Sequence, residues 1–334
     1  MNSKRFAILG LLAVAVGVGG YWWSRVASER QDEPVGSVSI AASLTVSPAP
    51  IWVAHDKGFF RAVGLESTVR PYSSGKTTTE AMLKGETDLS ASAEFLVASK
   101  VYAHPDLRIL GTLAFVHQIQ LLGLKDRGIG SVADIRGKRV AVKLGTNGEY
   151  FLERLLTLNS MTRDDIQWVD LKPQAMNEAL AEGSVDAALV WPPFVQQIVT
   201  SLGDRVALFD GQPGQDYYYV VLGRQEWLEA NPLVAERVMK ALTMAEEWLV
   251  AHPEEARAYL SERLSVDPMM IGRVLDESRF AVTLPQALVI AMEAEFRWLE
   301  AQHLVEPERR PELLDLIAAE PLRQVAPARV NIAR

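Results

Sequence analysis

Apolar and polar residues follow one another along the chain in a pattern that predicts short strands separated by helices. Strands are predicted at residues 38–43, 65–69, 89–91 and 107–113, with helical segments at 50–60, 77–83 and 94–103 between them. Two of these segments reach Gly58 and Gly85, and glycine commonly marks the end of a helix. Strands that alternate with helices form parallel sheets with helices on both faces, so we expect an α/β fold.

The same alternation begins again in the middle of the chain. Strands are predicted at 139–142, 166–170, 185–190 and 206–209, with helices at 148–158, 174–181 and 194–201. Two apolar runs, 118–124 and 217–222, flank this second series, and each is predicted to be a strand that crosses between two lobes. From residue 224 onward the pattern is helical. The tail after Pro321 contains few core residues, and we expect it to fray.

This organisation predicts a chain of two lobes. Residues 37–123 and 223–320 are assigned to lobe 1, and residues 124–222 to lobe 2. Residues 24–36 are polar and are interpreted as a linker that precedes lobe 1.

The N-terminal segment 1–23 carries a signal for export. Lys4 and Arg5 precede an uncharged run at 6–23, about 27 Å long at 1.5 Å per residue, which nearly spans a bilayer. The best cleavage site, Val26–Ser28, is poor because it lies beyond Arg25. We therefore favour an uncleaved membrane anchor over a cleaved signal peptide, with a buried helix of a cytosolic protein as the third reading. The two cations predict that the N-terminus stays inside and that the body is periplasmic.

Composition narrows the classes of function. Apolar residues make up 49% of the chain, which is typical of a folded protein, and the net charge of −8 argues against a nucleic-acid partner. The chain has no cysteine, which excludes disulfides, thiolate metal sites, cysteine nucleophiles and a lipid-modified cysteine. Its five histidines are scattered, and no two have metal-ligand spacing. We expect no metal, no cofactor and no enzymatic activity, since no Ser/His/Asp set stands out either.

Ligands of open parallel sheets bind at the carboxyl ends of the strands. The loops predicted there are rich in hydroxyls, glycine or aromatic residues, at 45–50, 72–77, 92–94, 145–148 and 191–193. Ser74, Gly75 and Lys76 open directly into a helix, so backbone N–H groups and a side-chain cation could hold an anion. Helix capping by Ser74 or Thr77 is an equally good reading.

A second loop of the same kind contains Thr146 and Asn147 between two glycines, and capping is the simpler reading there. The Gly75–Thr77 triplet resembles a phosphate-binding loop only superficially. The glycine that such a loop requires five residues earlier is replaced by Arg70, so we exclude a nucleotide site.

Aromatic and acidic candidates accompany these loops. Trp52 and Trp191 are possible ligand platforms, although tryptophan is more often a core residue; Trp191 is favoured because it ends a strand before two prolines. The Tyr217–Tyr219 run is a further aromatic candidate. Glu94 follows a strand and could accept hydrogen bonds from a ligand, or it could be an acidic residue at a helix N-terminus.

Four segments in order resemble the nitrate, sulfonate, taurine and thiamine-precursor group of ABC-type periplasmic binding proteins. They lie at 49–65, where Lys57-Gly58 is followed by two phenylalanines, at 74–88, at 134–146 and at 179–193. The resemblance covers residues ~38 to ~225. Asp88 and Asp186, each at the entry to a strand, are among its strongest points. The cysteine-rich motif of related pyrimidine-forming enzymes is missing, which argues against thiamine-precursor synthesis.

The resemblance implies a type II periplasmic binding protein fold, in which two doubly wound sheets are joined by two crossover strands and the ligand binds in the cleft between. Carried over by position, the cleft residues are Ser47, Trp52, Ser74, Gly75, Lys76, Glu94, Thr146, Asn147 and Trp191.

The function that the resemblance implies is capture of a small organic solute and its delivery to an ABC permease and ATPase. A membrane-anchored sensory or scaffold protein of the same fold is the alternative. We expect the ligand to carry a polar, anionic group of the sulfonate or nitrate type, or to be a heterocycle. If Glu94 also faces the cleft, a zwitterionic ligand would satisfy both Lys76 and Glu94.

Overall fold

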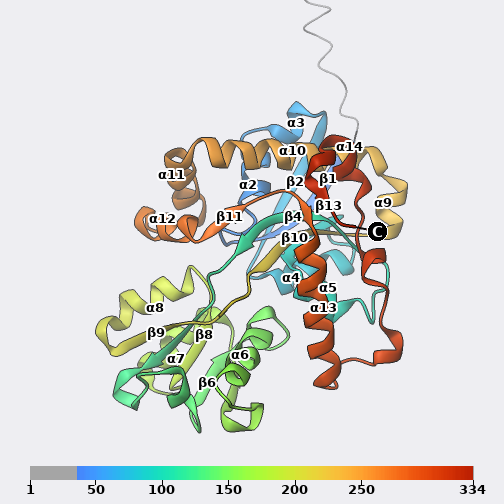
Figure 1. The fold of residues 1–334 in the computed structure, drawn as a ribbon. Helices are drawn as coiled ribbons and strands as arrows, with labels where there is room; N and C mark the ends of the chain where they lie inside the picture. The colour runs from blue at the N-terminus through green and yellow to red at the C-terminus, as the bar shows by residue number, and fades with distance from the viewer. Residues whose placement is uncertain (1–35, 334) are drawn as a thin grey trace, which may run out of the picture.

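The computed structural model describes residues 36–333, which form two α/β lobes (Figure 1). The first lobe contains a six-stranded sheet in the order β11-β4-β10-β3-β1-β2. Its strands are β1 (Gly36–Ser43), β2 (Leu65–Tyr72), β3 (Leu89–Ala93), β4 (Leu107–Val116), β10 (Tyr217–Arg224) and β11 (Ser278–Phe280). A short pair, β12 (Leu284–Pro285) and β13 (Val330–Asn331), lies beside it.

The second lobe is built on a five-stranded sheet in the order β7-β6-β8-β5-β9. Its strands are β5 (Gln120–Leu124), β6 (Arg139–Val142), β7 (Gln167–Asp170), β8 (Ala187–Val190) and β9 (Val206–Asp210). Its helices are α6 (Asn147–Leu158), α7 (Pro173–Glu182) and α8 (Phe194–Leu202).

The helices of the first lobe come from both ends of the chain. The N-terminal ones are α2 (Ala49–Asp56), α3 (Phe59–Ala62), α4 (Gly75–Leu83) and α5 (Phe95–Lys100). The C-terminal ones are α9 (Gln225–Ala230), α10 (Pro232–Ala251), α11 (Pro253–Leu264), α12 (Pro268–Asp276), α13 (Gln286–Ala301) and α14 (Glu320–Val325). The helix predicted at 50–60 is interrupted at Gly58, whose φ of 76° is a left-handed conformation that favours glycine and separates α2 from α3.

Strand direction places the candidate loops at one edge of each sheet. In the first lobe β1 runs parallel to β2 and β3, whereas β10 is antiparallel to β3 and pairs Tyr219 with Ala93. The beginning of β10 therefore meets the carboxyl ends of the parallel strands. In the second lobe β6 runs parallel to β7 and β8, and these strands end facing the first lobe (Figure 1).

The chain changes lobes earlier than the apolar runs indicated. β5 pairs with β8 and β9 of the second sheet, while β10 pairs with β3 and β4 of the first. The crossings therefore occupy 117–119 and 211–216, rather than the limits at 123/124 and 222/223. Hydrophobicity could not locate them, because β4 and β5 on either side of the first crossing and β10 after the second are all largely buried.

Gln212 joins the two crossing segments. Its Oε1 accepts hydrogen bonds from the backbone N–H groups of Gln118 and Ile119, both at 2.7 Å, and its Nε2 donates to the carbonyl oxygen of Val116 at 3.0 Å. Gln212 is fully buried. One side chain thus satisfies backbone groups that leave the β-ladders where the chain crosses.

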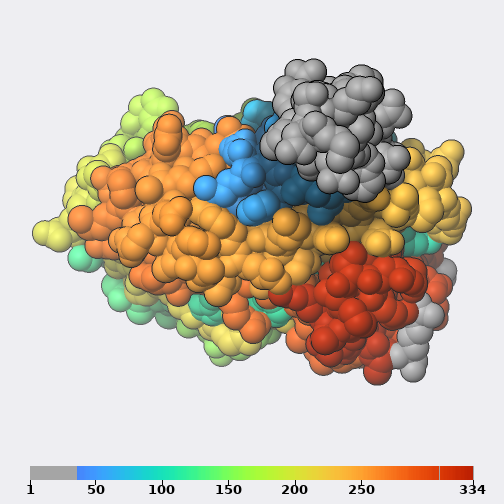
Figure 2. Space-filling model, turned by 90° about the horizontal axis from the view of Figure 1, so that it is seen from above, coloured from blue at the N-terminus to red at the C-terminus, as the bar shows by residue number. Residues whose placement is uncertain are grey.

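The C-terminal tail does not fray, contrary to expectation. Leu322 of α14 is fully buried and α14 packs against α10, while Arg329 forms an ion pair with Glu246. Figure 2 shows this C-terminal segment lying against the long helices that cover the top of the first lobe. Composition could not predict that the tail is ordered, because the order depends on one buried leucine and on an ion-pair partner far away in the sequence.

The predicted anchor at 1–23 and nearly all of the linker at 24–36 lie outside the described residues. Between residues 36 and 333, no helix combines the length and apolar character needed to cross a membrane.

Candidate ligand-binding site

A small cavity lies between the lobes, at the edge where the parallel strands of both sheets end. Its volume is about 40 Å³, room for a few water molecules. It is lined by Ser43, Thr45, Ser47, Ser74, Gly75, Lys76, Ala93, Leu96, Thr146, Asn147, Trp191, Tyr217 and Tyr219. Seven of the nine residues predicted from the sequence are therefore brought together here; the exceptions are Trp52 and Glu94.

The first lobe presents the beginning of helix α4. Ser74 is its N-cap: the Ser74 hydroxyl accepts from the Thr77 N–H at 3.3 Å, and Thr77 Oγ1 accepts from the Ser74 N–H at 3.1 Å. The capping reading is thus correct for Ser74. It does not exclude a ligand, because the N–H groups of Gly75 and Lys76 in the first turn have no acceptor within the helix.

Gly75 is needed at this position for space. A Cβ atom there would lie 3.0 Å from Ser92 Cβ and 3.3 Å from the Tyr219 hydroxyl. The missing side chain lets the start of α4 approach β3 and β10 closely, and this brings its N–H groups to the cavity.

Lys76 reaches across the cavity to the other lobe. Its Nζ donates a hydrogen bond to the carbonyl oxygen of Leu144 at 3.2 Å. No carboxylate lies within 4.0 Å of this amine in the described part of the chain. The cation is thus held by a neutral carbonyl, and an anion would be a stronger partner.

The second lobe presents the beginning of helix α6. The Thr146 hydroxyl accepts from the Gly148 N–H at 3.2 Å and donates to the Lys143 carbonyl at 2.7 Å, so capping is again correct. Asn147 is the first residue of the helix and is nearly buried. The nearby carboxylate of Glu149 accepts from the Gly145 N–H at 2.7 Å and pairs with Arg163 at 2.9 Å, a cation that it shares with Glu153 at 3.1 Å.

A chain of hydroxyl groups forms one wall of the cavity; none of its members is among the nine predicted cleft residues, although Thr45 and Tyr219 lie in segments that the sequence singled out. Ser43 Oγ lies 2.8 Å from Thr45 Oγ1 and 2.7 Å from the Tyr219 hydroxyl. Burial raises the pKa values of Tyr217 and Tyr219 by more than the hydrogen bonds from neighbouring serines lower them. Both phenols therefore stay protonated at neutral pH and can donate hydrogen bonds.

The position of these tyrosines could have been inferred from strand periodicity. Tyr217 and Tyr219 are two residues apart, so they share one face of β10, and both line the cavity. Tyr218 points the other way and packs edge-on against Phe115, with ring centroids 4.9 Å apart. The missing information was that β10 runs antiparallel and begins at the cleft edge.

Trp52 is a core residue and does not line the cavity, which corrects the prediction. Its indole is fully buried on α2 and donates to the Ser43 carbonyl at 3.3 Å. The Arg263 guanidinium lies 4.3 Å from the ring centroid. Trp52 supports the hydroxyl wall from behind, because α2 turns this face toward the core of the lobe.

Glu94 is also turned away from the cavity, although its neighbours Ala93 and Leu96 line it. Its fully buried carboxylate accepts from the Tyr218 N–H at 2.9 Å, and its other oxygen has no hydrogen-bond partner. Nearby on α13, Glu295 is equally buried and both of its oxygens lack partners. The expected direct contact of Glu94 with a ligand is therefore not supported by its orientation.

The two glutamates form a buried acidic pair. Burial raises the pKa of Glu94 to about 8, while hydrogen bonds from backbone N–H groups act against it. Burial and the neighbouring Glu94 charge raise the pKa of Glu295 well above its usual value. The pair therefore keeps protons at neutral pH and adds little negative charge beneath the cavity.

Aromatic rings make a second contact between the lobes. Tyr150 on α6 packs against Trp298 on α13, with ring centroids 5.5 Å apart, and stacks on Phe95 on α5 at 6.1 Å. The Tyr150 hydroxyl donates to Gln215 of a crossing segment at 3.0 Å. This cluster fixes the spacing of α5 and α6 beside the cavity.

The lining has a definite chemical character. It combines one ammonium group, several hydroxyls, one amide and one indole, and none of its described residues is acidic or a histidine. Hydroxyl and N–H donors around a single cation suit an anionic group, and the indole of Trp191 offers a flat apolar surface beside them.

Comparisons with known proteins agree with this architecture. A family model described as NMT1/THI5 like matches residues 46–256, more than half of the chain. A protein named as a binding protein in Brucella abortus (strain 2308) is 26% identical over 221 residues, covering 64% of this chain and 67% of that protein. The taurine-binding periplasmic protein of Escherichia coli (strain K12) is 23% identical over 223 residues, covering 65% and 68%.

Solved structures share the fold. The alkanesulfonate-binding protein SsuA from Xanthomonas axonopodis pv. citri, bound to MOPS, has a TM-score of 0.73 and 22% identity, covering 85% of this chain and 98% of that chain. The desulfurization enzyme DSZB has a TM-score of 0.69 and 16% identity, covering 88% and 99%. These likenesses confirm the predicted two-lobed periplasmic binding protein fold; because one of the two is an enzyme, fold alone does not decide the activity.

Proposed function

Because this chain belongs to the NMT1/THI5-like family, we propose that it is an extracytoplasmic solute-binding protein that captures a small organic anion between its lobes. The observation that carries the proposal is the acid-free cavity, where Lys76 of one lobe reaches the Leu144 carbonyl of the other at 3.2 Å. An anionic ligand would replace that carbonyl as the partner of the amine. It would also engage the N–H groups at the start of α4.

The orientation of Glu94 sharpens the choice of ligand. A zwitterion was needed only if Glu94 faced the cavity, and its carboxyl group is instead buried against β10. A simple anion, such as a sulfonate with a small apolar or aromatic part, therefore fits the lining better. The names of the taurine-binding and alkanesulfonate-binding relatives support this class.

We propose that the protein delivers its bound ligand to a membrane permease with its ATPase. We place it in the periplasm, because the taurine-binding relative is named as a periplasmic protein. Retention by an N-terminal anchor at 1–23 remains part of the proposal. An enzymatic role would need a group that activates one of the hydroxyls, and the described lining contains no histidine or carboxylate to do so. The sensory alternative has no observation in its favour.

The proposal is tested by calorimetric titration with a series of alkanesulfonates and nitrate, on wild type and two lysine variants. Lys76→Ala should weaken sulfonate binding about tenfold, as expected for loss of one charge-assisted hydrogen bond, and should reduce its salt dependence. Lys84→Ala is the matched control, since Lys84 is exposed at the other end of the same helix. Equal affinities for the two variants, or no binding of any anion by wild type, would refute the anion site.

A further inference from the structure

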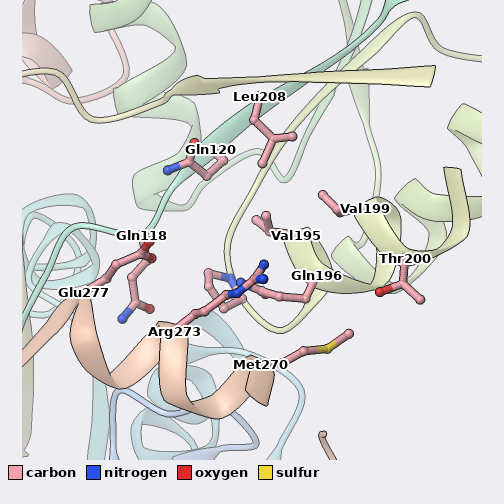
Figure 3. A pocket seen from close by; sticks show the side chains of 11 residues that line it. Gln118, Gln120, Val195, Gln196, Val199, Thr200, Leu208, Met270, Arg273 and Glu277 are labelled. Atoms are coloured by element: carbon pink, nitrogen blue, oxygen red, sulfur yellow. The ribbon is translucent and has the colours of Figure 1, made fainter. Parts of the chain in front are cut away.

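A second cavity lies between the lobes, separated from the first by the turn at Trp191 and Pro192. Trp191 lines the first cavity, whereas Pro192 lines the second, which has a volume of about 230 Å³. Helix α8 and strand β9 form its wall in the second lobe, and α12 forms its wall in the first (Figure 3). No residue lines both cavities, so the second is a distinct candidate site.

Strand order shows where this cavity sits. Its walls include β9 and the α12 helix that precedes β11, and both strands are edges of their sheets. Gln118 of the crossing segment also lines it. The first cavity is lined by residues of β1, β3 and β10, which are inner strands of the first sheet. The second cavity is therefore on the outer flank of the crossing segments.

Two opposite charges at the C-terminal end of α12, Glu277 being the residue that caps the helix, face this cavity. Arg273 and Glu277 are one turn apart, a spacing at which such residues commonly pair with each other. Here neither has an opposite charge within 4.0 Å among residues 36–333. In Figure 3 the Arg273 guanidinium points to the middle of the cavity beside Gln196, while Glu277 lies toward Gln118. One cation and one anion thus line the same space without a direct ion pair, although burial raises the pKa of Glu277 and the positive charge of Arg273 acts against that rise.

The remaining lining is neutral. The side-chain oxygen of Gln196 is buried and has no hydrogen-bond donor. Val195, Val199 and Met270 supply an apolar surface between the polar groups. An occupant that satisfies all of these features needs an anionic end, an N–H-bearing cationic end and an aliphatic middle.

We propose that this cavity binds a small zwitterion, an aliphatic chain with a carboxylate at one end and an ammonium at the other. The guanidinium of Arg273 can hold the carboxylate with two parallel hydrogen bonds. The ammonium group pairs with Glu277 and has the Gln196 oxygen as a further acceptor, while the methylene groups pack on Val195 and Met270.

Because the walls of this cavity come from both lobes, a bound zwitterion would bridge them. By thermodynamic linkage, any effect of the zwitterion on anion affinity in the cleft is matched by an equal effect of the anion on zwitterion affinity.

The test uses three four-carbon probes that differ in which charged ends they carry: γ-aminobutyrate, butyrate and butylamine, titrated into the full-length chain by calorimetry. We expect γ-aminobutyrate to bind at least about tenfold more tightly than either analogue, since each carries only one of the two charges. Arg273→Gln should remove the advantage over butylamine, and Glu277→Gln the advantage over butyrate. Arg297→Gln is the matched control, because that side chain is 74% exposed on α13.

Three outcomes would overturn the proposal. The first is equal affinity for all three probes, and the second is wild-type affinity in both α12 variants. The third is loss of γ-aminobutyrate binding in Lys76→Ala together with full binding in Arg273→Gln, which would place the probe in the first cavity. The variants should keep the wild-type melting temperature, because neither residue has an ion-pair partner to lose.

Discussion

The two lobes repeat one structural unit and differ in what they place at its cleft end. In each, an aspartate before the third parallel strand accepts a hydrogen bond from the backbone N–H of the first strand: Asp88 from Ser39 at 2.7 Å, and Asp186 from Arg139 at 2.9 Å. The second lobe adds the Arg139 guanidinium, 2.8 Å from Asp186. The aspartate that accepts this backbone hydrogen bond therefore has a second partner in each lobe, a hydroxyl group in the first and a guanidinium group in the second.

The cleft ends differ more. The residue after the third strand is the buried Glu94 in the first lobe and the cavity-lining Trp191 in the second. The capped helix follows the second strand in the first lobe, at Ser74, but the first strand in the second lobe, at Thr146. A repeated scaffold thus gives an asymmetric site, in which one lobe supplies the charge and the other supplies neutral hydrogen bonds and an indole.

The largest effect is expected from Glu94, the member of this comparison that is buried. The pKa of this carboxyl group is raised in the folded state, so its ionisation disfavours folding. The free energy of unfolding should therefore fall as pH rises from the usual pKa, about 4.5, toward about 8. Glu94→Gln removes one ionisable group and its repulsion of Glu295. We expect the variant to be more stable than wild type at pH 9 by a few kcal/mol, and the two to be similar at pH 5.

Melting temperatures across this pH range measure the effect. Trp191→Ala, at the corresponding position in the other lobe, is the control and should keep the wild-type pH dependence. A wild-type melting temperature that is constant from pH 5 to pH 9 would show that the pair does not titrate there.

The two strand-entry aspartates test whether the shared backbone bond is equally important. Asp186→Asn should lower the free energy of unfolding by about 3 kcal/mol and Asp88→Asn by about half as much, because only Asp186 is charge-paired. The Arg139 hydrogen bonds lower the pKa of Asp186, while its partial burial acts against them. Its contribution is therefore complete above the usual aspartate pKa, and it is lost as pH falls below about 4.

Urea unfolding of both variants at pH 7 and pH 3 provides the measurement. The gap between Asp186→Asn and wild type should narrow at the lower pH. A larger loss for Asp88→Asn than for Asp186→Asn at pH 7 would contradict the comparison.

The helix caps should have smaller and similar effects in the two lobes. Ser74→Ala and Thr146→Ala each remove a side-chain acceptor from a helix N-terminus, which typically costs about 1 kcal/mol of stability. Chemical denaturation measures both. Glycine in place of either residue should recover most of the loss. No loss in either variant would mean that a neighbouring group takes over the cap.

Trp191 should affect ligand affinity rather than the stability of the fold. Trp191→Ala is expected to weaken binding of an aromatic sulfonate by about 0.5–1.5 kcal/mol beyond the loss of buried area. Binding of a short alkanesulfonate should change less, since it has no ring to stack. If affinity is unchanged while the melting temperature drops, Trp191 is a core residue like Trp52.

The sequence by itself determined the local features of this protein. Alternating polarity located most strands, and the order of strands and helices predicted two α/β lobes. The hydroxyl–glycine loops at 74–76 and 145–148 were correctly placed at the ends of strands and the starts of helices. These features depend on backbone geometry over a few residues, which the nearby side chains control.

Only the tertiary structure decided which way the side chains at those positions face. Trp52 and Trp191 were both candidate ligand platforms, but α2 turns Trp52 into the core while Trp191 lines the cavity. Glu94 is buried because β10 and α13, contributed from far along the chain, cover it. The tyrosines of β10 and the charges of α12 reach the space between the lobes for the same reason. The contacts that orient these side chains join segments distant in sequence, and no local pattern contains that information.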